Sequence, residues 1–113
     1  FGRAAAYQTA FNFIVTDLPR IYRDNNSLSD DITGVRVHLE DRDNPPYENL
    51  CEDAIITHVN GIPTPNVAVF QAVVEQACRI PGQNIRLRVQ YPPENYYSSL
   101  GGVGAVNNIR IPR

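Results

Sequence analysis

The sequence has no lysine, no methionine and no tryptophan, and only two cysteines among its 113 residues. All ten basic residues are therefore arginine, a bias that nothing in the sequence explains. No apolar run approaches the roughly 18 residues that a membrane-spanning helix needs, so we expect no transmembrane segment. The two cysteines do not have a Cys-x-x-Cys spacing, which excludes the metal-binding and redox motifs built on that spacing.

Motifs for catalysis are also absent. The sequence has no glycine-rich phosphate loop, and none of the serines at positions 27, 29, 98 and 99 has the setting of a hydrolase nucleophile. The net charge of −2 provides no basic footprint for nucleic acid. We therefore expect a chain that is not an enzyme, with no catalytic residue, no cofactor and no nucleic-acid partner.

Cys51 and Cys78 leave two alternatives open. A disulfide between them would close a long loop and could stabilise the fold by about 3 kcal/mol. Two small buried thiols are the other alternative, and we favour it, because one cysteine precedes a predicted strand and the other lies near the end of a predicted helix.

Two histidines are the other candidates for a metal site. His38 and His58 lie on different predicted strands and, together with the acidic residues at 40–43, could bind a metal ion if those strands were neighbours. Solvated or hydrogen-bonded histidines are the alternative that we favour. The acidic loop at 40–48 also lacks the residue spacing of a calcium-binding loop. The sequence therefore predicts no metal site.

Several segments have the pattern of β-strands. Segments 34–40 and 84–90 alternate between apolar and polar residues, which is typical of half-buried strands. Segment 54–59 is apolar and rich in β-branched residues, which indicates a buried strand. Further strands are expected at 10–17 and 105–111. The residues expected to point inward are Phe11, Phe13, Val15, Val35, Val37, Leu39, Ile85, Leu87 and Val89.

A turn and a helix are predicted between the strands at 54–59 and 84–90. Asn60-Gly61 supplies the positive φ angles of a tight turn. Thr64 is expected to cap the helix, with Pro65 at the first helical position. The helix should end at about Cys78, before Pro81-Gly82. Its expected core face comprises Val67, Phe70, Val74 and Ala77.

This order of elements resembles the second half of a PDZ domain, and is closest to the PDZ-like domains of HtrA/Deg-type serine proteases. The resemblance extends over 10–91, is strongest over 53–89, and is carried by Val59-Asn60-Gly61-Ile62-Pro63-Thr64-Pro65-Asn66. It implies an α+β, PDZ-like fold: a five- to six-stranded antiparallel β-sandwich or partial barrel, capped by one long helix and one short helix at Tyr47–Leu50. Residues 1–9 would form a frayed or helical N-terminal arm, and 92–113 a C-terminal extension with room for one more strand.

The resemblance also implies a peptide-binding site. In such domains an extended peptide adds as a strand between a loop with its following strand and the long helix. The matching residues are Phe11, Asn12, Phe13 and Val15 on the loop and strand, and Asn66, Val69 and Val73 on the helix. Asn12 stands where the family has glycine, and asparagine tolerates a left-handed backbone better than most residues. The alternative for Phe11 and Phe13 is plain core packing.

Two functions remain open. The chain is expected to be a non-catalytic interaction module that binds peptide segments or C-termini by β-strand addition. Alternatively, it is a PDZ-like accessory subunit of a larger complex, one that could be associated with an organellar membrane. Because methionine is absent, Phe1 is not expected to be a translation start, and we expect the chain to be a processed precursor or a fragment. An initial phenylalanine resembles plastid proteins of algae with secondary plastids, and we favour a plastid or the periplasm as the location.

Overall fold

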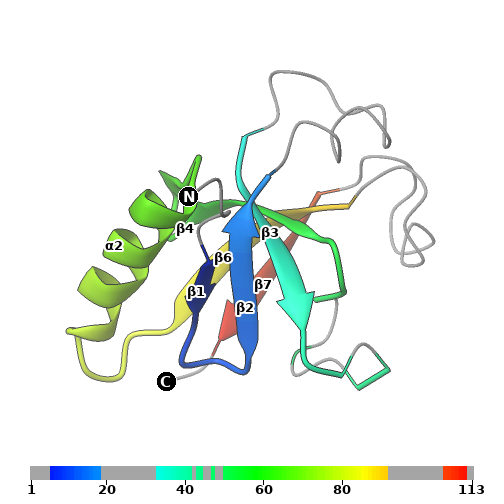
Figure 1. Ribbon diagram of the computed structural model, residues 1–113. Coiled ribbons are helices and arrows are strands. Elements are labelled where there is room, and N and C mark those ends of the chain that lie inside the picture. The colour runs from blue at the N-terminus through cyan, green and yellow to red at the C-terminus, as the bar shows by residue number, and fades with distance from the viewer. Residues whose placement is uncertain are drawn as a thin grey trace.

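The computed structural model describes residues 6–18, 33–41, 43–44, 47, 50–91 and 106–111, except for the side chains of 106 and 107. Within this part of the chain, an antiparallel β-sheet packs against one helix, so the fold is mixed α+β (Figure 1). The elements are β1 (Ala6–Gln8), β2 (Phe13–Asp17), β3 (Val35–Leu39), β4 (Ile55–Val59), β5 (Ile62–Pro63), α2 (Val67–Cys78), β6 (Ile85–Gln90) and β7 (Val106–Ile111).

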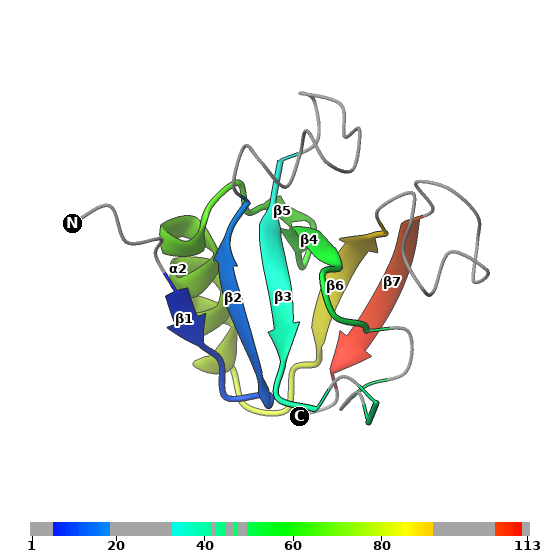
Figure 2. The ribbon, with the colours of Figure 1, turned by 45° about the vertical axis from the view of Figure 1, so that its right-hand side comes forward.

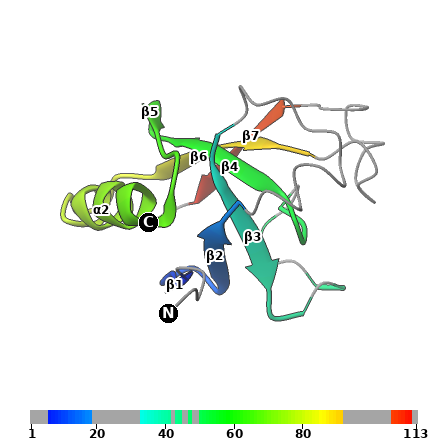
Figure 3. The same cartoon turned by 45° about the horizontal axis from the view of Figure 1, so that its top comes forward.

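The strands form one sheet in the order β1-β2-β3-β4-β6-β7, with β5 paired to β4. Strands β1 and β7 lie at opposite ends of this sheet (Figure 2). The sheet is strongly twisted, so that β2 and β3 run in a different direction from β6 in Figure 3. The described residues form seven strands, where we predicted five or six. The unexpected strands, β1 and β5, have three and two residues, too few for alternation to be visible in a sequence.

The hydrophobic core lies between α2 and the inner face of the sheet. The helix buries Val67, Phe70, Val74 and Ala77, as its periodicity predicted. The alternation predicted for the strands is also confirmed, apart from Leu39, which is only half-buried. The buried strand residues that face this core include Phe13, Val15, Val35, Val37, Ile56, Val59, Ile85, Leu87, Val89, Ile109 and Ile111.

The start of α2 differs from the prediction. Asn66, not Thr64, is the N-cap, and its side-chain oxygen accepts a hydrogen bond from the Val69 N–H at 2.9 Å. The Asp17 carboxylate, from the end of β2, accepts the Val67 N–H at 2.8 Å. Thr64 is held in extended chain because its N–H donates to the Thr57 carbonyl at 3.0 Å. The helix therefore begins two residues later than the local cap signal indicated, at a point fixed partly by a distant strand.

The N-terminal arm predicted at 1–9 contains a strand. Ala6–Gln8 forms β1, which pairs with β2 in the register Ala6↔Thr16, Tyr7↔Val15 and Gln8↔Ile14. The expectation of a frayed or helical arm is wrong for these residues, because a turn brings them back onto β2. Residues 1–5 lie outside the described part of the chain.

The turn between β1 and β2 explains why β2 begins at Phe13 and not at Ala10. The Thr9 hydroxyl donates to the Phe13 carbonyl at 2.7 Å and accepts the Phe11 N–H at 3.1 Å. Asn12 has a φ of 70°, which is the left-handed conformation that we expected asparagine to tolerate there.

Two further predictions can be compared with the structure, and two concern residues outside its described part. Asn60 and Gly61 have φ angles of 52° and 82°, which confirms the predicted turn. No disulfide joins Cys51 and Cys78, as in the favoured alternative of two buried thiols, although Cys78 is only half-buried. The predicted short helix at Tyr47–Leu50 cannot be placed, because two of its four residues, Glu48 and Asn49, lie outside the described part of the chain. The structure likewise does not describe residues 92–105.

Candidate functional site

The predicted peptide site is divided between the core and the surface. Phe11, Phe13 and Val15 are 8%, 1% and 0% exposed and belong to the core cluster. Core packing, the alternative for the two phenylalanines, therefore describes their side chains. Asn12, between them, is exposed. The aromatic rings of this segment are therefore not in a position to contact a bound peptide.

The helix residues of the predicted site occupy three settings. Asn66 is exposed and caps the helix. Val69 is half-buried, and Val73 is half-buried and packs against the core. The two valines thus remain partly accessible on α2, on a face distinct from that of Phe70 and Val74.

Strand β1 lies beside β2 near α2, where the resemblance implied that a peptide would lie (Figures 1 and 3). Tyr7 is directly opposite Val15, so both side chains are on the core side of the sheet. The Tyr7 ring contacts Phe70 of α2 in an edge-on geometry, with ring centroids 6.2 Å apart and planes at 65°. The edge of β2 that does not pair with β3 is therefore already paired with an extended segment of the same chain, β1.

The environment of the Tyr7 hydroxyl is unfavourable to a phenolate. Burial raises the pKa of Tyr7, and the nearby Glu75 carboxylate and Cys78 raise it further. Tyr7 therefore stays neutral well into the alkaline range. We did not identify Tyr7 as a site residue, because a three-residue strand has no periodicity that could reveal which side chain points inward.

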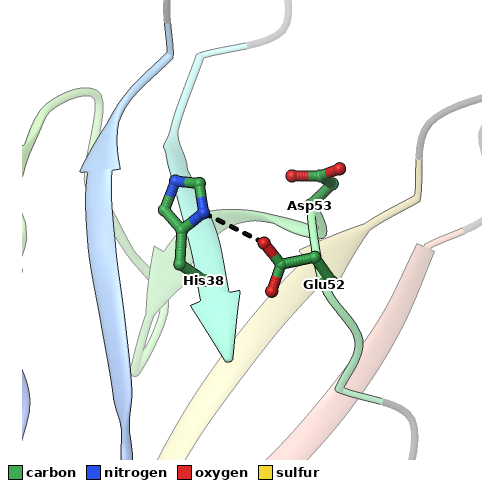
Figure 4. Close-up of side chains that lie close together, drawn as sticks. All are labelled: His38, Glu52 and Asp53. Carbon is green, nitrogen blue, oxygen red and sulfur yellow. Dashed lines mark hydrogen bonds and ion pairs between the residues drawn. The ribbon is translucent and has the colours of Figure 1, made fainter. Parts of the chain in front are cut away.

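A second candidate site lies on the outer face of β2 and β3. The His38 ring bonds the Thr16 hydroxyl through Nε2 at 3.0 Å. Its Nδ1 bonds the Glu52 carboxylate at 3.0 Å (Figure 4). The second oxygen of Glu52 accepts the Leu39 N–H at 2.6 Å. Glu52 thus ties the segment before β4 to the end of β3, and His38 is held from both ring nitrogens.

The neighbouring Asp53 extends this group toward a possible metal site. Ligand atoms of His38, Glu52 and Asp53 lie within 4.8 Å of one another. However, Asp53 accepts from Arg36 Nε at 2.8 Å, so a guanidinium already supplies positive charge there. A metal ion would have to compete with Arg36 and with the hydrogen bonds of His38 and Glu52. The geometry is that of a closed polar network.

Of the metal ligands weighed in the sequence, His38 belongs to the group that comes together, whereas His58 and the acidic residues at 40–43 do not. His58 bonds the hydroxyl of its neighbour Thr57 at 2.9 Å and is not part of the group around His38. Asp41 closes its own turn by accepting from the Asp43 N–H and the Asn44 side chain, both at 3.0 Å. These hydrogen bonds lower the pKa of Asp41. Glu52, the actual partner of His38, could be found only once the strands were paired.

The order hydroxyl, imidazole, carboxylate in Thr16, His38 and Glu52 matches that of a hydrolase triad. A nucleophile also needs backbone N–H donors aimed at a developing oxyanion. Thr16 is in the middle of β2, which is paired with β1 on one side and β3 on the other. The backbone N–H groups of β2 are therefore directed into sheet pairing and not toward an oxyanion beside Thr16.

No family model, no curated protein and no solved structure matches the chain. No helix in the described part of the chain has the length and apolar character to cross a membrane.

Proposed function

We propose that this chain is a non-catalytic, PDZ-like protein-interaction module that binds an extended polypeptide segment by strand addition to β2, beside α2. The observation that supports the proposal is β1, which is bound in this way within the chain itself. Its main chain pairs with Ile14, Val15 and Thr16, and its one inward side chain, Tyr7, contacts α2. Main-chain pairing with one anchored side chain is how strand addition combines affinity with selectivity.

The chemistry of the preferred segment follows from β1. The side chain opposite Val15 should be aromatic, because it meets Phe70. Small or polar residues should flank it, since Ala6 and Gln8 are exposed. Internal segments are favoured over free C-termini, because the Phe11 N–H in the preceding loop already donates to Thr9 and is not available to a terminal carboxylate.

The test uses the full chain carrying Tyr7→Ala, which weakens the attachment of β1 and leaves β2 and α2 intact. A synthetic peptide with the sequence of residues 3–9 should bind this variant with micromolar affinity and bind the wild type at least about tenfold more weakly, because β1 competes. The control peptide carries alanine in place of tyrosine and should bind neither. Absence of peptide binding to a folded Tyr7→Ala variant, measured by calorimetry, would overturn the proposal.

A second candidate is an accessory subunit of a larger complex. The pairing of β1 with β2 favours this candidate as well. Because β1 occupies the edge of β2 that a peptide would use, a permanent partner would contact other surfaces. Native mass spectrometry of the chain from its source distinguishes the two. A stoichiometric complex supports the subunit role, and a free chain that takes up peptide supports the interaction module.

A further inference from the structure

Three arginines gather on the outer face of β6 and β7. Arg86 and Arg88 are two positions apart on β6, and Arg110 lies directly opposite Arg86 on β7. All three are exposed, while their neighbours Ile85, Leu87, Ile109 and Ile111 point into the core. We call Arg86, Arg88 and Arg110 the arginine face. It lies on the side of the sheet that faces away from α2.

The arginine face has no internal charge compensation among the described residues. Strands β4, β6 and β7 contain no acidic residue. The ion pairs found in the described part of the chain join Arg36 to Asp53 and His38 to Glu52, so none includes the three arginines. The residues opposite Arg88 are His58 on β4 and Asn108 on β7, which add a polar rim and no negative charge.

The pairing of Arg86 with Arg110 has an energetic consequence. Residues directly opposite in an antiparallel pair have Cβ atoms about 5 Å apart, and like charges at such positions destabilise the sheet. Here the repulsion sits in the longest paired segment of the sheet, where six consecutive residue pairs join β6 to β7. An anionic group between the two guanidinium groups would convert the repulsion into attraction.

We propose that the arginine face binds an acidic, extended segment of a protein partner. Arg86 and Arg88 lie about 7 Å apart along their strand, the same repeat that separates alternate side chains of an extended chain. Carboxylates at alternate positions of such a segment therefore match the guanidinium groups, each of which can hold a carboxylate with two parallel hydrogen bonds. A nucleic acid is a poorer match, because the net charge of −2 repels a long polyanion, while a short acidic segment responds mainly to the local charge. This surface is separate from the β2 and α2 region, so the inference does not depend on the proposed function.

The test adds a synthetic peptide of alternating glutamate and threonine to the full-length protein and follows backbone amide shifts by NMR. Shifts should concentrate on β6, β7 and the outward residues of β4, and weaken as salt is added. Arg86→Gln combined with Arg110→Gln should reduce the affinity about tenfold or more. Arg79→Gln, which removes another exposed charge at the end of α2, is the matched control and should change the affinity less than about twofold.

Three outcomes would overturn the inference. These are an absence of shifts on β6 and β7, an equal loss of affinity in Arg79→Gln, or tighter binding of a single-stranded oligonucleotide than of the acidic peptide. The last outcome would assign the face to phosphate recognition. A peptide of alternating glutamine and threonine separates the role of charge from that of strand shape, and should not bind.

Discussion

At the scale of single residues, Thr64 and Asn66 are the two candidates for the N-cap of α2. Both are residue types that cap helices, and local sequence favours Thr64 because Pro65 follows it. The structure gives the role to Asn66, while Thr64 is 0% exposed and its hydroxyl has no hydrogen-bond partner among the described residues. A buried hydroxyl without a partner is unfavourable.

These roles predict opposite effects for two substitutions. Asn66→Ala should lower the free energy of unfolding by about 1 kcal/mol. Thr64→Val keeps the shape of the side chain and should leave stability unchanged or raise it by about 1 kcal/mol, since it removes an unsatisfied group. Urea denaturation of both variants measures this. A loss of stability in Thr64→Val as large as that in Asn66→Ala would show that the Thr64 hydroxyl also stabilises the start of the helix.

Tyr7 predicts a specific dependence of stability on pH. Its folded-state pKa lies above the ordinary value of 10.0 because of burial, Glu75 and Cys78. The stabilisation is therefore fully present below about pH 10 and is lost as the pH rises through the folded pKa. Tyr7→Phe should show a smaller loss of stability over this range in urea denaturation. Tyr47, whose pKa burial also raises, is present in both proteins, so the difference isolates Tyr7.

At the scale of elements, Glu52 links the end of β3 to the segment that enters β4. It accepts hydrogen bonds from the His38 ring and the Leu39 N–H. Glu52→Gln keeps the size of the side chain but weakens both charge-assisted bonds, and should lower the free energy of unfolding by about 1–2 kcal/mol. The matched control is Glu75→Gln on the exposed surface of α2, which should change it by less than about 0.5 kcal/mol.

The same network predicts the response to metal ions. Because Arg36 holds Asp53, zinc added to the wild type should leave the melting temperature unchanged. In Arg36→Ala the group of His38, Glu52 and Asp53 is relieved of the competing guanidinium, and zinc should raise the melting temperature. Calorimetry with and without zinc checks both. A rise in the wild type would show that the network is open to metal.

The pairing of β6 and β7 predicts a stabilising charge reversal. Arg110→Glu replaces a repulsive pair opposite Arg86 with an attractive one, and should raise the free energy of unfolding by about 0.2–1 kcal/mol. Arg110→Gln removes the repulsion alone and should fall between wild type and Arg110→Glu. Thermal unfolding at low and high salt distinguishes the charge effect, which salt weakens. A destabilising Arg110→Glu would show that Arg110 has an anionic neighbour already.

At the scale of the whole molecule, the sheet is arranged so that its two ends differ. One end is β1, which is anchored to the helix through Tyr7 and Phe70. The other end is β7, which carries part of the arginine face away from the helix. A partner bound at one end therefore need not obstruct a partner at the other, which allows the two proposed surfaces to be tested independently.

The sequence determined the elements whose signals are local. The strands β3, β4, β6 and β7, the turn at Asn60-Gly61 and the buried face of α2 were predictable, because side-chain periodicity and the backbone preferences of glycine and asparagine act over a few residues. The left-handed conformation of Asn12, with its φ of 70°, follows from the same kind of preference. For Phe11 and Phe13, the sequence left two alternatives, peptide binding and core packing, and the buried position corresponds to the second.

The tertiary structure decided what depends on contacts between distant residues. Asp17 helps to set the first turn of α2, 50 residues along the chain, and Glu52 becomes the partner of His38. The meeting of Arg86 with Arg110 likewise depends on the register of two strands that are far apart in sequence. None of these has a local signal, because the energy of each contact exists only after chain segments have been brought together.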